Sequence, residues 1–281
     1  MRVVKTVPSL RRTIKKIKSR NKTIGFVPTM GALHEGHCSL IRKSRRENDI
    51  VIISIFVNPK QFGPKEDFQA YPRPEKKDIL LAKNEKVDII FYPSEKTMYP
   101  TGFLTSIHVD AITDRLCGAS RPGHFRGVTT VVGKLVNMVT PDVLYLGQKD
   151  AQQAVVLKRM ITDLDFPVTV KVCSIIRGPD GLALSSRNKY LTPRQRKTAT
   201  VLFKSLKEAK RNALAGERNA ANITRIIRAT IKKDSSGKID YIACMNSCSL
   251  IPLKQLKGKV MIALAVKFGR TRLIDNIIFH I

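Results

Sequence analysis

The chain has 281 residues, of which 43% are hydrophobic, enough to build a large folded core. No stretch approaches the roughly 18 consecutive apolar residues of a transmembrane helix, which excludes that class of membrane protein. The five cysteines have neither the spacing of a disulfide framework nor the neighbouring ligands of a zinc site, so we expect reduced thiols in a cytoplasmic protein.

The net charge is +29, from 51 Lys and Arg against 22 Asp and Glu. Such a charge is typical of nucleic-acid-binding proteins, but the basic residues are spread along the whole chain. Trp is absent and aromatic residues are only 6%, so platforms for base stacking are scarce. We therefore expect no nucleic-acid partner, while the charge favours anionic small molecules.

The first part of the chain alternates strand patterns with helical patterns. Its basic start, residues 1–20, predicts a surface helix, with an amphipathic import peptide as the alternative. Five nearly continuous β-branched runs predict strands covered on both faces: residues 23–29, 49–57, 87–93, 142–147 and 168–176. Apolar residues at helical spacing follow in 128–139 and 157–164. This alternation predicts an α/β fold with a doubly wound parallel sheet, whose ligands bind at the carboxyl ends of the strands.

The pattern changes after Arg177. A capping box of Thr192 and Gln195 predicts a helical region that continues to about Ala215, and a second helical pattern covers residues 220–232. Three strand patterns follow, the last two joined tightly enough to form an antiparallel pair. This part predicts a smaller α+β domain.

The stretch "PTMGALHEGH" follows the first strong strand pattern. His34 and His37 lie three residues apart at the start of a predicted helix, where unpaired backbone N–H groups and the helix dipole attract anions. Gly36 lets a ligand approach the backbone. A nucleotide phosphate fits this combination best. Zinc is the alternative, but the two histidines have no obvious third ligand.

Three further loops carry candidate residues. In "LGQKDAQQ", Lys149 is a cation at the end of a strand and Asp150 suits a helix start, while Gln153 is predicted to face inward. In "GLALSSRN", the run Ser185, Ser186 and Arg187 provides adjacent donors for a phosphate. In "FVNPKQFGPKEDF", Gln61 lies in a Pro- and Gly-rich loop of the kind that often carries function.

Taken in this order, these motifs, with "SRPGHFRGV" and "TRLIDNI", resemble the pantoate–β-alanine ligase family. "HEGH" looks like the HxGH motif of the nucleotidylyltransferase superfamily, which class I aminoacyl-tRNA synthetases share, and "LSSRN" looks like its second, mobile ATP-binding motif. The resemblance implies a Rossmann-like catalytic domain over residues 1–177 and a C-terminal α+β lid domain over 178–281. It also implies a homodimer.

The resemblance implies ATP-dependent ligation of pantoate and β-alanine to pantothenate through a pantoyl adenylate, with Mg²⁺ on the phosphates and release of AMP and pyrophosphate. His37 would be the proton donor, and the other catalytic residues would be His34, Lys149, Ser185, Ser186 and Arg187. The implied ATP-binding residues are Met30, Gly31, Ala32, Leu33, His34, Glu35, Gly36, His37, Gly147, Gln148, Lys149, Asp150, Ile176, Leu184, Ser185, Ser186 and Arg187. Gln61 and Gln153 would hold pantoate, and Gln61 would also reach β-alanine. No residue is implied as a metal ligand.

Two alternatives remain at this point. An adenylyltransferase for another acceptor would keep the HxGH motif but would not need Gln61 and Gln153. A nucleic-acid-binding protein on a nucleotide-binding fold would show salt-sensitive affinity for RNA without ATP turnover.

Overall fold

The computed structural model describes residues 1–64 and 66–281. The chain divides into two compact units. The first unit contains residues 1–113, 118–147 and 156–173, and the second contains residues 114–117, 148–155 and 174–281. Within the described part of the chain, no helix combines the length and apolar character needed to cross a membrane.

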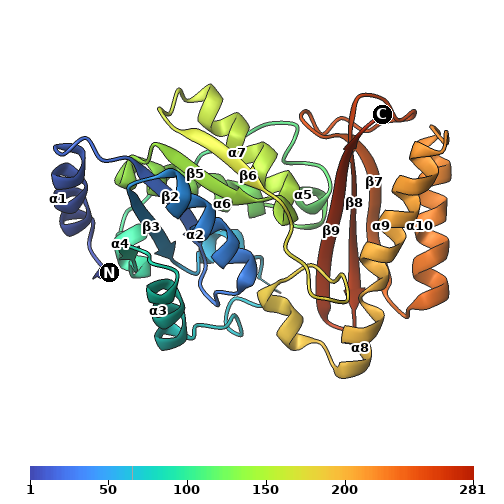
Figure 1. Ribbon diagram of the computed structural model, residues 1–281, viewed down its shortest axis with the longest axis horizontal. Helices are drawn as coiled ribbons and strands as arrows, with labels where there is room; N and C mark the ends of the chain where they lie inside the picture. Colours follow the sequence, from blue (N-terminus) through green and yellow to red (C-terminus); the bar gives the residue numbers. More distant parts are fainter. Residues whose placement is uncertain (65) are drawn as a thin grey trace. The chain divides into compact units, whose positions relative to one another are not determined.

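The first unit is built on a six-stranded parallel sheet in the order β1-β4-β3-β2-β5-β6 (Figure 1). The strands are β1 (Arg2–Val4), β2 (Ile24–Thr29), β3 (Ile50–Ile55), β4 (Ile89–Phe91), β5 (Val143–Gly147) and β6 (Thr169–Cys173). The predicted α/β fold with a parallel sheet is therefore confirmed. The strand order reverses between β2 and β5, the position at which such sheets bind ligands.

Helices connect these strands. They are α1 (Val7–Lys18), α2 (Glu35–Glu47), α3 (Glu75–Asn84), α4 (Glu95–Met98) and α6 (His124–Val139), with a 3₁₀ turn, η1 (Pro59–Gln61). Two more helices, α5 (Cys117–Ser120) and α7 (Ala151–Asp163), are divided between the units. Leu40 and Ile41 of α2 pack with Val27, Ile53 and Tyr145 of the sheet in one buried cluster, so α2 is fixed against the strand that precedes it.

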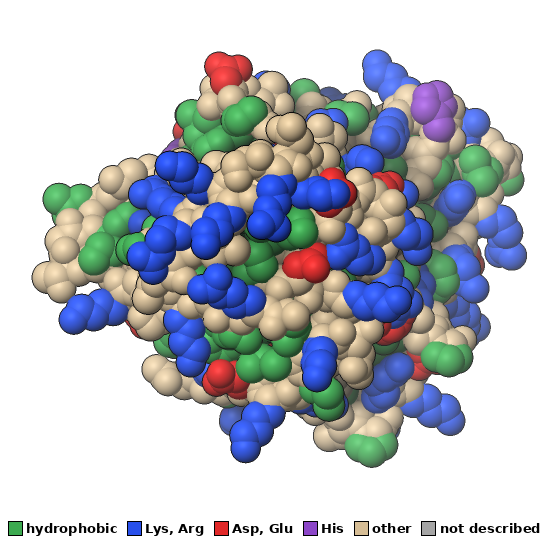
Figure 2. All heavy atoms as spheres, turned by 60° about the vertical axis from the view of Figure 1, so that its left-hand side comes forward, with side chains coloured by type: hydrophobic (Ala, Val, Ile, Leu, Met, Phe, Trp, Pro, Cys, Tyr) green, Lys and Arg blue, Asp and Glu red, His purple; other side chains and the backbone are tan. Residues whose placement is uncertain are grey.

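The predicted surface helix at the start of the chain is present as α1, but strand β1 precedes it. Leu10 and Ile14 are the buried residues of α1, and its exposed face is basic. Lys and Arg side chains are distributed over the face of the molecule shown in Figure 2, with few acidic side chains among them. On this face the basic charge is therefore spread out rather than gathered in one patch.

The second unit contains a three-stranded antiparallel sheet in the order β7-β8-β9. Its elements are η2 (Gln148–Asp150), η3 (Ser186–Tyr190), α8 (Pro193–Thr198), α9 (Val201–Leu214), α10 (Ala220–Asp234), β7 (Lys238–Asn246), β8 (Lys259–Phe268) and β9 (Thr271–His280). Leu206 of α9 and Ile227 of α10 are fully buried with Ile262 and Leu264 of β8. The two helices thus cover one face of the sheet (Figure 1).

The capping box predicted for Thr192 and Gln195 is present at the start of α8. The helical region that was predicted to run on to Ala215 is interrupted, because α8 ends at Thr198 and α9 begins at Val201. Ala199, at the break, is fully buried, and both Ala199 and Thr200 keep helical dihedral angles.

Candidate active site

His34 and His37 together cap the start of α2. His34 is the N-cap residue, and its Nδ1 accepts a hydrogen bond from the Gly36 N–H at 3.1 Å. The His37 Nδ1 accepts from the His34 N–H at 3.3 Å, and the two ring centroids lie 4.1 Å apart. Because both Nδ1 atoms act as acceptors, each neutral imidazole carries its proton on Nε2. In this form the ring donor is Nε2–H, which can give a hydrogen bond to an anion.

This geometry corrects one expectation. The N–H groups of Gly36 and His37 are not unpaired, because Gly36 donates to His34 Nδ1 and His37 donates to the His34 carbonyl at 2.8 Å. A β-carbon at residue 36 would lie 2.8 Å from His34 Cε1, so glycine here makes room for the imidazole ring. These two backbone donors are therefore already used within the helix start.

Gln61 lies at the end of η1 and is buried, with 9% of its surface exposed. Its Nε2 donates to the Met30 Sδ at 3.0 Å, and its Oε1 accepts from the Asn58 Nδ2 at 3.1 Å. Asn58 is in turn held by the Tyr99 hydroxyl, which donates to its Oδ1 at 2.7 Å, and by the Gly127 carbonyl. The structure thus brings together two predicted site residues, Met30 and Gln61, on a rigid support.

A second group fixes the backbone of Gln61. The His124 Nδ1–H donates to the Gln61 carbonyl at 2.8 Å, and the His124 Nε2 accepts from Arg121 at 2.9 Å. Arg121 pairs with both carboxylate oxygens of Glu66, at 2.5 and 2.6 Å. Burial raises the pKa of Glu66, but the Arg121 guanidinium outweighs this effect and holds the pKa below its ordinary value. Arg121 and His124 come from the "SRPGHFRGV" motif, which now has a structural explanation.

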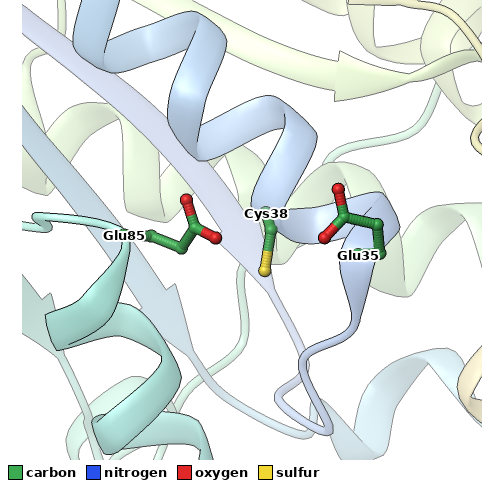
Figure 3. Close-up of side chains that lie close together, drawn as sticks. All are labelled: Glu35, Cys38 and Glu85. Atoms are coloured by element: carbon green, nitrogen blue, oxygen red, sulfur yellow. The ribbon is translucent and has the colours of Figure 1, made fainter.

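Glu35, Cys38 and Glu85 form a group with the residue types of a metal site (Figure 3). Arg42 pairs with both carboxylates, with Glu35 at 2.6 Å and with Glu85 at 2.9 Å. Burial, followed by the nearby charges of Glu85 and Glu35, raises the pKa of Cys38 to about 11, so the thiol is protonated at neutral pH. The arrangement is that of an ion-pair network, and the thiolate that a metal requires is disfavoured.

In the second unit, the predicted residues Lys149 and Asp150 lie in η2, with the Lys149 Nζ 3.5 Å from an Asp150 carboxylate oxygen. Gln153 is only partly buried, whereas its neighbour Gln152 is 6% exposed. Gln152 accepts from the Cys117 N–H at 2.9 Å and donates to the Arg115 carbonyl at 2.7 Å. The buried glutamine of the two is therefore Gln152, with a structural role, and Gln153 is the more exposed one.

The C-terminal strand holds the segment that contains Lys149. The Asn276 Nδ2 donates to the carbonyls of Gln148 and Lys149 at 2.9 and 3.1 Å, and its Oδ1 accepts from the Gln148 side chain at 3.2 Å. Asp275 pairs with both Nη atoms of Arg177 at 2.7 and 2.9 Å. The "TRLIDNI" motif was noted in the sequence, but no pattern indicated that its Asp and Asn support these two segments.

The predicted residues Ile176 and Leu184 face each other across a hairpin. The Leu184 N–H donates to the Ile176 carbonyl at 3.0 Å, and Arg177 forms a β-bridge with Ala183. Ser185 then caps η3, where its hydroxyl accepts from the Arg187 N–H at 3.3 Å. The hairpin therefore fixes where the Ser185–Arg187 run begins.

Comparison with known proteins gives consistent matches over the whole chain. The model of a family described as Pantoate-beta-alanine ligase matches residues 2–278. Pantothenate synthetases of Caldicellulosiruptor saccharolyticus and Acetivibrio thermocellus are 53% and 51% identical over 281 residues, covering 100% of both chains in each case. Among solved structures, a pantothenate synthetase from Thermus thermophilus has a TM-score of 0.94 at 42% identity, with 99% of each chain covered. A pantoate–β-alanine ligase from Francisella tularensis, in complex with β-γ ATP and β-alanine, has a TM-score of 0.81 at 38% identity, and the match covers 99% of this chain and 97% of that one.

Proposed function

This chain belongs to the pantoate–β-alanine ligase family and is an enzyme that joins pantoate and β-alanine into pantothenate. From that premise, we propose that the reaction has two steps and that ATP is the activating substrate. The observation that carries the proposal is the histidine pair at the start of α2, whose Nε2–H groups suit the phosphates of a nucleotide. A carboxylate is a poor acyl donor, and adenylation turns one of its oxygens into part of a good leaving group.

In the first step, a pantoate carboxylate oxygen attacks the α-phosphorus of ATP. The bond from that phosphorus to the bridging oxygen breaks, and pyrophosphate leaves. Negative charge builds on the phosphate oxygens, so fixed donors lower the barrier. We assign this role to His34 and to His37, which is also the proton donor, and in the second unit to Lys149, Ser185, Ser186 and Arg187.

In the second step, the amine of β-alanine attacks the acyl carbon of pantoyl adenylate. The bond to the AMP oxygen breaks, AMP leaves and the amine gives up a proton. No covalent bond to the enzyme is needed, so none of the five cysteines is required as a nucleophile.

Gln61 and Gln153 are proposed to hold pantoate, and Gln61 also to contact β-alanine. The support for Gln61 is its rigid placement by Asn58 and Met30, which suits a residue that must orient a small substrate. The support for Gln153 is its accessible position beside the buried Gln152. The ATP-binding role of residues 30–37, 147–150, Ile176 and 184–187 also remains a proposal.

We propose that Mg²⁺ is bound mainly by the phosphate oxygens of ATP, where it supplies neutralising charge. Asp150 offers an oxygen ligand of the hard type that Mg²⁺ prefers, and about half of its side chain is exposed (49%). The Glu35, Cys38 and Glu85 group does not fit, because it includes a thiol and its carboxylates are paired with Arg42.

Three other features stay predictions: the homodimer, the cytoplasmic location and a lid role for the C-terminal domain. The lid role is tested by limited proteolysis around residues 181–190. Protection by ATP and pantoate together would support it, and an unchanged cleavage rate would contradict it.

ATP–pyrophosphate exchange, measured with and without pantoate and in the absence of β-alanine, tests the two-step reaction. Exchange that requires pantoate is expected, because pyrophosphate can re-enter only through the adenylate. A folded protein that binds ATP but shows no pantoate-dependent exchange would contradict the proposal and would point to another acceptor.

A further inference from the structure

The loop between β2 and α2 has an unusual backbone. Gly31 has a φ of +79° and Ala32 a φ of +49°, so two consecutive residues occupy the left-handed region. Glycine adopts this conformation readily, but alanine does so only at a cost in free energy, and an external contact must hold it there. The loop leads directly into His34, so its conformation sets where the histidine pair begins.

Asp78, in the first half of α3, provides that contact. Its Oδ2 accepts a hydrogen bond from the Ala32 N–H and its Oδ1 accepts from the Leu33 N–H, each at 2.8 Å. The residue is only 2% exposed, so these charge-assisted hydrogen bonds form away from solvent. One carboxylate therefore accepts hydrogen bonds from two successive backbone N–H groups of a loop that lies 45 to 46 residues earlier in the chain.

The neighbouring side chains leave no room for a side chain at residue 31 of this loop. A β-carbon at residue 31 would lie 2.9 Å from the Asp78 Oδ2 and 3.0 Å from the Ile55 Cγ2. Gly31 is thus required both by its φ and by the closeness of the carboxylate. The Gly31 N–H also donates to the Thr29 hydroxyl at 3.1 Å, so the turn is fixed at both ends.

We propose that Asp78 is a positioning residue for adenylate formation: it holds residues 31–33 in the left-handed conformation that places His34 and His37 against the ATP phosphates. This inference rests on the proposed function for the role of the histidines, but the hydrogen bonds themselves do not depend on it. Asp78 acts through the backbone and is not itself a catalytic group.

The test compares Asp78→Asn with a matched control, Asp142→Asn. Asp142 also accepts a backbone N–H beside β2, that of Ile24 at 2.6 Å, but at the opposite end of the strand from the histidines. Asparagine keeps the shape of Asp78 but replaces one acceptor by an NH₂ group that faces a backbone donor. Pantoate-dependent ATP–pyrophosphate exchange at saturating substrates and amide hydrogen exchange at residues 32 and 33 are measured for both variants, well below their unfolding temperatures.

We expect Asp78→Asn to lose about 100-fold in pyrophosphate exchange, because a shift of the histidines by about 1 Å has an effect of that order. Its amides at residues 32 and 33 should exchange faster while those of β2 stay protected. Asp142→Asn should remain within about threefold of the wild type, since it leaves the histidine loop unchanged. A purely structural role for Asp78 would instead lower the unfolding temperature and leave turnover per folded molecule intact.

Turnover of Asp78→Asn within threefold of the wild type, or unchanged protection of residues 32 and 33, would overturn the inference. Should Asp78→Asn fail to fold, Asp78→Glu keeps both acceptors but displaces them by one methylene, and the same two readouts apply. If the wild type itself shows no pyrophosphate exchange, the proposed function fails. In that case amide protection still decides whether Asp78 holds the loop.

Discussion

The His37 Nδ1 accepts a hydrogen bond from the backbone N–H of His34 at 3.3 Å, so the proposed proton donor is also part of the helix cap. Its Nδ1 atom therefore has a structural role, while the chemical role proposed for this side chain falls to Nε2. The two functions can be separated by substitution, because asparagine places an acceptor near the position of Nδ1 but does not reach that of Nε2.

We predict that His37→Asn retains the cap but loses ATP–pyrophosphate exchange by about 100-fold or more, the typical contribution of a positioned proton donor. His37→Ala should lose the same activity and also about 1 kcal/mol of stability, the usual cost of removing a cap. Thermal unfolding and exchange kinetics of both variants check this. Near-normal turnover of His37→Asn would remove Nε2 from the mechanism.

Gln152 and Gln153 are adjacent, and we predict opposite effects for them. Gln152→Ala should lower the free energy of unfolding by about 1–3 kcal/mol, because it leaves the Cys117 N–H and the Arg115 carbonyl without their buried partner. Gln153→Ala should leave stability unchanged and raise the KM for pantoate about tenfold, equivalent to the loss of about 1.4 kcal/mol of binding. Denaturant unfolding and steady-state kinetics separate the two. An unchanged pantoate KM in Gln153→Ala would contradict its assignment.

Asn276→Asp should weaken ATP binding. The substitution keeps the size of the side chain but replaces the two N–H donors to the Gln148 and Lys149 carbonyls by an oxygen that repels them. We expect a rise in the KM for ATP of about tenfold. Asn246→Asp is the control, because Asn246 uses its Oδ1 as an acceptor from Cys248 and Ser249 and aspartate keeps that acceptor. Equal ATP KM values for the two variants would be evidence against this role of Asn276.

The ion pair of Glu66 and Arg121 predicts acid sensitivity of the loop that carries Gln61. The folded-state pKa of Glu66 lies below its ordinary value of 4.5, so its stabilising contribution is fully present above about pH 4.5 and is lost as the pH falls through the folded-state pKa. Glu66→Gln should therefore be less stable than the wild type at pH 7, and the difference should shrink toward pH 3. Unfolding free energies of both proteins at pH 7 and pH 3 check this. If the stability difference between the wild type and Glu66→Gln grew on acidification, the pKa of Glu66 would be raised rather than lowered by folding.

Strands β2 to β5 could be predicted because each is a largely apolar run whose residues are mostly buried, a signal carried by the residues themselves. For β6 the expected cover on both faces was wrong, because its residues are exposed or only partly buried. β1 could not be predicted, because it has only three residues and exists through pairing of Arg2–Val4 with β4. The break between α8 and α9 was also missed, since Ala199 has a high helix propensity and nothing in the sequence around it indicates the end of a helix.

In the candidate site too, some residues could be predicted from the sequence and others could not. The histidines, Lys149 and the Ser185–Arg187 run stand out because their residue types suggest chemistry, although their roles remain predictions. Asp78 and Asn276 act on backbone groups that only folding brings near. Nothing in the sequence around Asp78 marks it, and the motif that contains Asn276 did not indicate this contact. For Gln152 and Gln153, helical spacing indicated a buried face, but a shift of one residue decides which of the two lies on it.

The contact between Asn276 and the Lys149 carbonyl spans 127 residues of chain. During translation, the segment containing Lys149 leaves the ribosome long before β9 is synthesised. Its hydrogen bonds to Asn276 can therefore form only after β9 has emerged. The parallel sheet of the first unit has no such dependence on β9, and domains generally fold as they emerge. A nascent chain should thus gain its histidine pair first and its ordered lysine segment last. With the role proposed for Lys149, this would delay catalytic competence until the synthesis of β9.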